Sequence, residues 1–247
     1  MKGSYWVINT KNGAFLTDRN DLIGKQICEN NIWEPEIIEI YTQLIKPEYT
    51  VLDIGAHMGF HTINFAKLSK HVYAFEPQKR LYNQLCGNVF LNEFSDKVTC
   101  FNIGLGEKNK KSSFGSLEGH NTLNWDGNWS EEMINYGGRS LEDDLGTNEI
   151  DIKPLDSLNM APNFIKMDVE DYELKTFQGA KNTIKTRLPI ILFESFAKNY
   201  SKVTEFLHEI GYEIITNSKL KASGNYIAIH PNSNDYKENK STLKKYK

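Results

Sequence analysis

The sequence is poor in cysteine and has no long apolar run. Cys28, Cys86 and Cys100 are odd in number, widely spaced and set in apolar patterns. This usage predicts reduced packing residues rather than a disulfide framework or a zinc site. No apolar stretch approaches the ~18 residues of a membrane span, and the chain does not open on a segment resembling a secretory leader. We therefore expect a cytoplasmic protein without a membrane span.

The chain also lacks an excess of charge of either sign. Its formal net charge is -3 over 247 residues, so no field of the whole chain recruits nucleic acid or an anionic membrane. The lysines near the end of the chain are not interleaved with aromatic residues, which disfavours a nucleic-acid patch. A hydrophobic content of 39% and a charged content of 25% are ordinary for a globular protein. We expect one main domain and no nucleic-acid partner, and the sequence indicates no particular oligomeric state.

Residues 1–50 predict a small cap that precedes the main domain. Asn12-Gly13 would supply the positive-φ turn of a hairpin between Ser4 and Thr17. A helix is expected to begin near Glu34-Pro35, because proline is tolerated at the first helical position, and to end before Pro47.

Residues 51–230 alternate between strand and helix patterns. Strands are predicted at 51–54, 72–75, 98–103, 163–169, 189–193, 212–215 and 226–230. Repeated alternation predicts an α/β fold with a mostly parallel seven-stranded sheet covered on both faces. No helical pattern separates the last two strands, so we expect them to form an antiparallel hairpin at one edge.

The alternation breaks at residues 108–151, which combine glycine and asparagine with aromatic side chains. A connection this long is usually functional or disordered, and its aromatic content argues against disorder. We predict a substrate lid, because flat aromatic faces and hydrogen-bonding side chains suit a polyhydroxylated ring. The alternative is that the aromatics anchor the loop onto the domain. The expected substrate contacts are His120, Asn121, Trp125 and Trp129.

The last segment, residues 231–247, is polar and rich in lysine. It carries no clear apolar pattern, so we predict a frayed tail.

The most informative motif is Asp53-Ile54-Gly55-Ala56-His57-Met58-Gly59, which predicts a strand, a glycine-bearing turn and the start of a helix. Glycines let a ligand approach the main chain, and a helix N-terminus offers N–H groups without partners. Glu76 ends the next predicted strand, where an acid can bind ribose hydroxyls. Together these features predict a site for a nucleoside cofactor.

The spacing of this motif disfavours a dinucleotide. A pyrophosphate needs a second glycine where the backbone recedes, but Ala56 and His57 occupy that interval. This counts against a nicotinamide-dependent oxidoreductase. An acid at position 53 suits the ammonium and sulfonium of S-adenosylmethionine instead. We predict that Asp53 binds the amino group of that cofactor, that Gly55 and Ala56 admit its carboxylate end, and that Glu76 binds its ribose. The alternative is that the two acids only cap the following helices.

Five blocks of the sequence resemble the FkbM-type methyltransferases, in the order and spacing of that family. They are 53–59, 74–77, 155–158, 165–174 and 189–194. The resemblance, which covers roughly residues 33–194, implies a Rossmann-like class I methyltransferase fold that uses S-adenosylmethionine. It also implies an acceptor hydroxyl on a sugar, glycan or related natural product. The expected cofactor-binding residues are Asp53, Gly55, Ala56, His57, Gly59, Glu76 and Pro77. Trp33 and Glu34 are expected to reach the cofactor from the cap, and the alternative for Glu34 is a first-turn acid of the following helix.

Two residues depart from the family's pattern. His57 stands where asparagine is usual, and a histidine there can still hydrogen-bond the cofactor. Asp171 stands where glycine is usual; aspartate is a good N-cap, so we expect it to start the following helix.

Three acids are predicted at the reacting end of the site. Asp168 follows the fourth core strand, Glu170 lies two residues on, and Glu194 ends the fifth strand. In an open parallel sheet, ligands bind outside these carboxyl ends. Asp168 would act as a general base on the acceptor hydroxyl, or would hold Mg²⁺ or Mn²⁺ together with Glu194 and Glu170. Lys166, on the same strand, is expected to pair with one of these acids. The alternative for Glu170 is a first-turn acid that stabilises a helix.

Two other functions remain compatible with these residues. A nitrogen-directed methyltransferase for a small molecule would need neither base nor metal. A domain that binds the cofactor without chemistry would serve as a scaffold.

Overall fold

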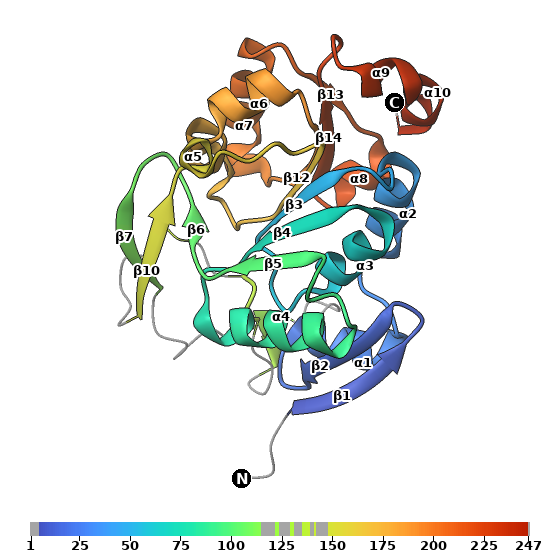
Figure 1. The fold of residues 1–247 in the computed structure, drawn as a ribbon, viewed down its shortest axis with the longest axis vertical. Helices are drawn as coiled ribbons and strands as arrows, with labels where there is room; N and C mark the ends of the chain where they lie inside the picture. Colours follow the sequence, from blue (N-terminus) through green and yellow to red (C-terminus); the bar gives the residue numbers. More distant parts are fainter. Residues whose placement is uncertain are drawn as a thin grey trace.

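A computed structural model of the chain describes residues 5–114, 122–123, 129–130, 135–138, 141 and 148–246. Its centre is a seven-stranded sheet in the order β13-β14-β12-β11-β3-β4-β5 (Figure 1). The strands are β3 (Thr50–Ile54), β4 (His71–Phe75), β5 (Val98–Phe101), β11 (Phe164–Met167), β12 (Ile190–Glu194), β13 (Glu213–Ile215) and β14 (Asn225–Ile229). Six strands of this sheet run in the same direction, and β14 runs antiparallel to both of its neighbours, β12 and β13. The predicted α/β fold with an antiparallel edge is confirmed.

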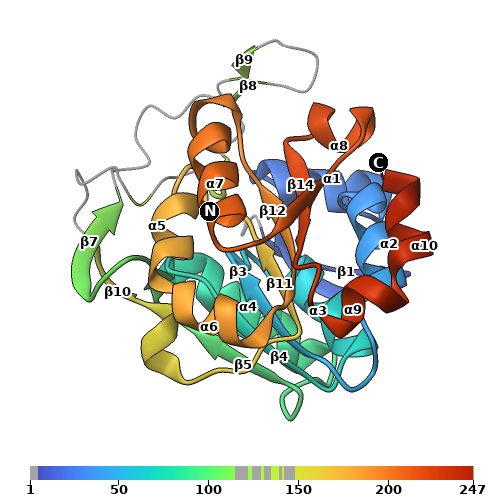
Figure 2. The same cartoon turned by 90° about the horizontal axis from the view of Figure 1, so that it is seen from above.

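Helices cover both faces of the sheet, as Figure 2 shows from above. One face packs against α2 (Pro35–Leu44), α3 (Phe60–Leu68) and α4 (Lys79–Leu91). The other packs against α5 (Glu173–Gly179), α6 (Lys181–Arg187) and α7 (Ala197–Glu209). Successive side chains of a strand point to opposite faces of the sheet, so Val51 packs into one core and Leu52 into the other.

The N-terminal residues form the predicted hairpin, from β1 (Tyr5–Thr10) and β2 (Gly13–Asp18). Asn88 of α4 accepts a hydrogen bond from the Leu16 N–H, and Asn92, which follows that helix, donates to the Ala14 carbonyl. These bonds tie β2 and the hairpin to the main domain. An additional helix, α1 (Leu22–Asn30), was not predicted. Asp21 caps it by accepting a hydrogen bond from the Gly24 N–H at 2.9 Å.

A second, three-stranded sheet flanks the core. It consists of β6 (Gly104–Leu105), β10 (Asn148–Lys153) and β7 (Lys110–Phe114), in that order. The two ends of the segment predicted as a lid are therefore strands of this sheet. Two further short strands, β8 (Thr122–Leu123) and β9 (Trp129–Ser130), pair with each other, and the 3₁₀ turn η1 (Leu155–Leu158) precedes β11.

Two expectations about the C-terminal part were wrong. A short helix, α8 (Ser218–Ala222), separates β13 from β14. The segment expected to fray instead forms α9 (Asn234–Glu238), α10 (Lys240–Leu243) and the 3₁₀ turn η2 (Lys244–Tyr246). Leu243 is buried in the core, and Asp235 accepts a hydrogen bond from Lys46 at 3.0 Å. These contacts order a segment that is polar by composition.

Cys28, Cys86 and Cys100 are free thiols. Among the described residues, no helix is long and apolar enough to cross a membrane.

Candidate active site

A cavity of about 300 Å³ lies outside the carboxyl ends of the central strands. We call it the central cavity. Its wall includes eight of the predicted site residues, namely Glu34, Gly55, His57, Glu76, Pro77, Asp168, Glu170 and Glu194. The described part of the wall does not include four other predicted site residues, namely Asp53, Ala56, Gly59 and Lys166.

Gly55 makes the turn at the floor of the central cavity possible. Its φ is +82°, and a β-carbon placed there would lie 1.7 Å from the carbonyl oxygen of Asp168. Any larger residue would therefore force β3 and the end of β11 apart. The N–H groups of Gly55 and Ala56 both donate to the carbonyl of Phe75, at 3.0 Å each. This closes the turn against the end of β4.

Glu76 lies on the cavity wall and is held by the backbone on both of its oxygens. One oxygen accepts from the His57 N–H and the other from the Gln78 N–H, each at 2.8 Å. Burial raises the pKa of Glu76 to about 7, while those two backbone donors favour its charged form. Each carboxylate oxygen keeps a further lone pair that can accept from a ligand hydroxyl.

His57 extends from the same turn with φ at +50°. That conformation is uncommon for residues other than glycine, and histidine is among those that adopt it more often. Both of its ring nitrogens are buried and have no hydrogen-bond partner among the described residues. Burial lowers the pKa of His57 and so favours the neutral ring. A β-carbon at Gly137 would lie 3.2 Å from the ring, which places His57 against that loop.

Asp53 differs from its predicted position. Its side chain is fully buried and lies behind the cavity wall rather than on it. One oxygen accepts a hydrogen bond from the Thr62 hydroxyl at 2.5 Å. Asp53 is the register partner of Lys166 on the neighbouring strand, so the two side chains lie on the same face of the sheet. Burial raises the pKa of Asp53, and the charge of Lys166 opposes that shift. Its other oxygen, Oδ1, is buried and has no hydrogen-bond partner among the described residues.

Lys166 pairs with Asp168, one of the acids expected as its partner. The ammonium lies 3.1 Å from a carboxylate oxygen of Asp168, and Lys166 is only 5% exposed. Burial alone would raise the pKa of Asp168, but Lys166 and Glu194 together hold it below its ordinary value. Asp168 is therefore a weak base in this environment.

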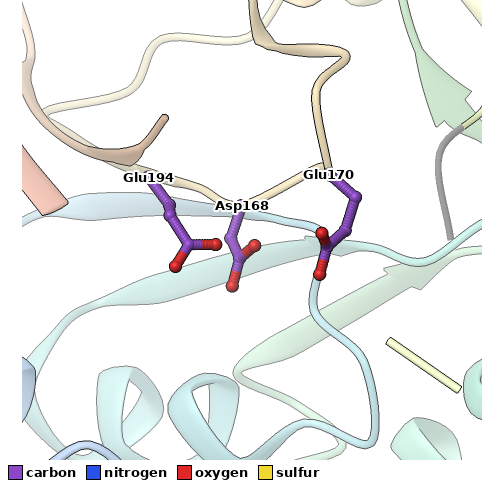
Figure 3. Close-up of side chains that lie close together, drawn as sticks. All are labelled: Asp168, Glu170 and Glu194. Carbon is purple, nitrogen blue, oxygen red and sulfur yellow. The ribbon is translucent and has the colours of Figure 1, made fainter. Parts of the chain in front are cut away.

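Asp168, Glu170 and Glu194 converge on one point, and we call them the acidic triad (Figure 3). One oxygen from each lies within 4.8 Å of the others. Burial, followed by the charge of Asp168, raises the pKa of Glu170 to about 8 and that of Glu194 to about 10. Like charges this close disfavour each other, so the triad favours a shared proton or a bound cation.

The backbone after β11 is strained at two successive residues. Glu170 has φ at +51° and Asp171 at +69°. The second value explains why glycine would be favourable at position 171. The expected N-cap role of Asp171 was wrong, because Tyr172 is the N-cap of α5 and no side chain caps that helix. Asp171 instead accepts hydrogen bonds from Asn199 through its carbonyl, at 2.9 Å, and its carboxylate, at 3.2 Å.

The predicted substrate contacts cannot be placed in the cavity. His120, Asn121 and Trp125 lie outside the described residues, and Trp129 is described only as a backbone residue of β9. The described wall instead contains apolar residues that the sequence analysis missed. These are Leu22 and Ile23 of α1 and Phe196 beyond β12; Trp33, which was expected to reach the cofactor from the cap, also lines the wall. Phe196 is 51% exposed. Phe196 lies two residues after Glu194, and an aromatic residue so close to a predicted strand-end acid was a signal that could have identified it.

Comparison with known families decides which proteins this chain is related to. A model of the methyltransferase FkbM domain matches residues 53–214. The chain belongs to the FkbM methyltransferase family. Among curated proteins, sequence comparison finds no match.

Two solved structures support the fold of the FkbM domain. The FkbM methyltransferase of Methylobacillus flagellatus KT has a TM-score of 0.53 and 18% identity, covering 78% of this chain and 50% of that one. The tRNA m1G37 methyltransferase of M. jannaschii has a TM-score of 0.52 and 12% identity, covering 93% of this chain and 58% of that one. At these identities the likeness establishes the fold alone. The chain spans only about half the length of these two proteins.

Proposed function

We propose that the protein is an S-adenosylmethionine-dependent O-methyltransferase acting on a hydroxyl of a sugar, glycan or related natural product. The acidic triad at the cavity wall is the observation that carries this proposal. Membership of the FkbM family supports the cofactor and the reaction type. The activity of the tRNA methyltransferase named above belongs to that protein, and the charge of this chain gives no support for a nucleic-acid acceptor.

The described wall fits a nucleoside that carries positive charge. Glu76 is positioned to accept ribose hydroxyls, and Pro77 and Gly55 lie beside it on the wall. The two buried ring nitrogens of His57 have no hydrogen-bond partner among the described residues. A bound ligand can supply such a partner. When bound, S-adenosylmethionine supplies a methyl group on a sulfonium. The residues of this chain must bind and orient the acceptor, exclude water and take up the acceptor proton.

We propose that the acidic triad holds Mg²⁺ or Mn²⁺, since carboxylate oxygens are the preferred ligands of these hard cations. Such an ion lowers the pKa of a bound hydroxyl. The pairing of Asp168 with Lys166 makes Asp168 a poor general base, which favours the metal over the base among the two alternatives. Lys166 then holds Asp168 in its charged form. The apolar wall residues Trp33 and Phe196 can exclude water on the acceptor side.

The proposed activity is tested by incubating the protein with methyl-deuterated S-adenosylmethionine and a panel of methyl glycosides. We expect a labelled methyl group on a hydroxyl of at least one glycoside, detected by mass spectrometry. Treatment with EDTA should lower turnover by about tenfold or more, and added Mn²⁺ or Mg²⁺ should restore it. Undiminished turnover in EDTA would instead favour a carboxylate base. Labelling only of amines in a parallel panel of small amines would support a nitrogen-directed enzyme.

Removing Glu76 is expected to weaken cofactor binding. Glu76→Ala should raise the Kd for S-adenosylhomocysteine by about tenfold to a hundredfold, because charge-assisted hydrogen bonds to the ribose are lost. Isothermal titration calorimetry measures this effect. Glu48→Ala, which removes an exposed glutamate, is the matched control and should leave the Kd unchanged. Equal affinity of the Glu76 variant and the wild type would remove Glu76 from the cofactor site.

A further inference from the structure

Glu34 is held in an unusual conformation at the edge of the central cavity. It precedes α2 with φ at 45° and ψ at 61°, and its side chain does not cap that helix. A left-handed backbone at a glutamate is costly and persists only when surrounding contacts determine it. Those contacts come from α3, because the Glu34 carboxylate lies 2.9 Å from Nε2 of His61. The Glu34 side chain is 24% exposed and lines the cavity.

His61 is itself fixed from behind. Its Nδ1 lies 3.4 Å from the hydroxyl of Tyr41, which is fully buried on α2. Burial, with the charges of Asp53 and Glu34, raises the pKa of Tyr41, so the phenol stays protonated and can donate. A ring that accepts at Nδ1 carries its proton on Nε2 and donates it to Glu34. The aromatic rings of Phe60 and Phe65 pack around His61 and limit its rotation.

Among the carboxylates that line the described part of the central cavity, Glu34 is the one for which no ligand has yet been proposed. Glu76 faces the proposed ribose position, and the acidic triad forms the proposed metal site. Asp53, expected to bind the amino group of the cofactor, is fully buried behind the wall. Glu34 lines the same cavity as Glu194, and its negative charge contributes to the raised pKa values of Lys166 and Glu194. A carboxylate in this position suits a cation with several N–H donors.

We propose that Glu34 binds the ammonium group of the cofactor's methionine moiety, and that His61 is the residue that positions Glu34, with Tyr41 fixing the His61 tautomer. This assignment rests on the proposed function, since it takes S-adenosylmethionine as the cofactor. It transfers to Glu34 the role that the sequence suggested for Asp53.

Calorimetry with two nucleosides tests the assignment. S-adenosylhomocysteine carries the ammonium group, whereas 5′-methylthioadenosine lacks the amino-acid moiety. For Glu34→Gln we expect the Kd for S-adenosylhomocysteine to rise about tenfold or more, while the Kd for 5′-methylthioadenosine stays within about twofold. Glu36→Gln removes an exposed glutamate from the first turn of α2 and should change neither Kd.

The positioning role of His61 has its own variants. His61→Phe keeps an aromatic ring in the packed site but cannot donate to Glu34, so its Kd for S-adenosylhomocysteine should rise about tenfold. His61→Gln retains an N–H donor and should recover part of that loss. The double variant with Glu34→Gln should bind no more weakly than Glu34→Gln alone, because His61 acts through Glu34. Retained binding of 5′-methylthioadenosine shows that each variant is folded. If His61→Phe does not fold, the result for Glu34→Gln alone tests the assignment of Glu34.

The outcomes separate the two proposals. A wild-type protein that binds neither nucleoside would refute the proposed function. A wild-type protein that binds both, with Glu34→Gln binding S-adenosylhomocysteine equally well, would overturn the assignment of Glu34 and leave the proposed function standing. The assignment of Glu34 is likewise overturned if that variant loses methyl transfer but keeps its affinity for both nucleosides.

Discussion

Asp168→Asn should lower kcat for methyl transfer to the accepted glycoside by about 10³-fold, with the Kd for S-adenosylhomocysteine within about twofold of the wild type. Asparagine keeps the shape of the side chain but removes the negative charge at the centre of the acidic triad. The remaining acids, Glu170 and Glu194, then hold a divalent cation more weakly. We also expect the Mn²⁺ concentration needed for half-maximal turnover to rise.

Asp171→Asn provides the matched control for Asp168→Asn. The residue is also an aspartate after β11, and asparagine tolerates its positive φ and can still accept the hydrogen bond from Asn199. We expect turnover and Mn²⁺ dependence close to those of the wild type. If the Asp168 variant retained wild-type turnover, or lost S-adenosylhomocysteine binding together with turnover, the triad would not be the activating group.

The second large effect is expected at Gly55. Gly55→Ala would place its β-carbon 1.7 Å from the carbonyl oxygen of Asp168, in a backbone with φ at +82°. The clash is with main chain, so a change of rotamer cannot relieve it. We expect a loss of stability of about 3 kcal/mol or more, seen as a fall in Tm of about 6–12 °C by differential scanning calorimetry. Binding of S-adenosylhomocysteine should be lost as well, because the turn also positions His57 and Glu76.

Gly87→Ala is the control for this substitution. Gly87 lies within α4, and a β-carbon there would meet only Leu16, at an ordinary contact distance of 3.7 Å. Alanine favours a helix over glycine by about 1 kcal/mol, so Tm should stay constant or rise. A Gly55 variant that melted with the wild type would show that β3 and β11 can separate locally without cost.

The fold could be predicted from the sequence because its signals are local and repeated. Buried strand patterns such as 51–54 and 189–193 recur with helical patterns between them, and parallel strands joined by helices have few arrangements. The missed elements lacked such a pattern. Residues 231–247 are polar, and contacts with distant residues such as Lys46 help to hold the helical turns between Asn234 and Tyr246 in place.

The candidate site could be predicted only in part. The strand-end acids Glu76, Asp168 and Glu194 were found because a parallel sheet brings its carboxyl ends to one edge. The same rule predicted that Asp53 lines the site. It gives no information about which helix packs over a side chain, and Asp53 is fully buried. Phe196 was missed because an exposed aromatic carries no periodic signal.

The sequence by itself determined the order of the strands along the chain, the family and the set of acids at one end of the sheet. It could do so because strand periodicity and motif spacing are properties of neighbouring residues. Only the tertiary structure decided which acids reach the central cavity. The packing of α3 against β3 buries Asp53, whereas the contact between His61 and Glu34 directs a carboxylate from the cap into the cavity. Both outcomes depend on side chains that meet across elements, and no local pattern encodes such a meeting.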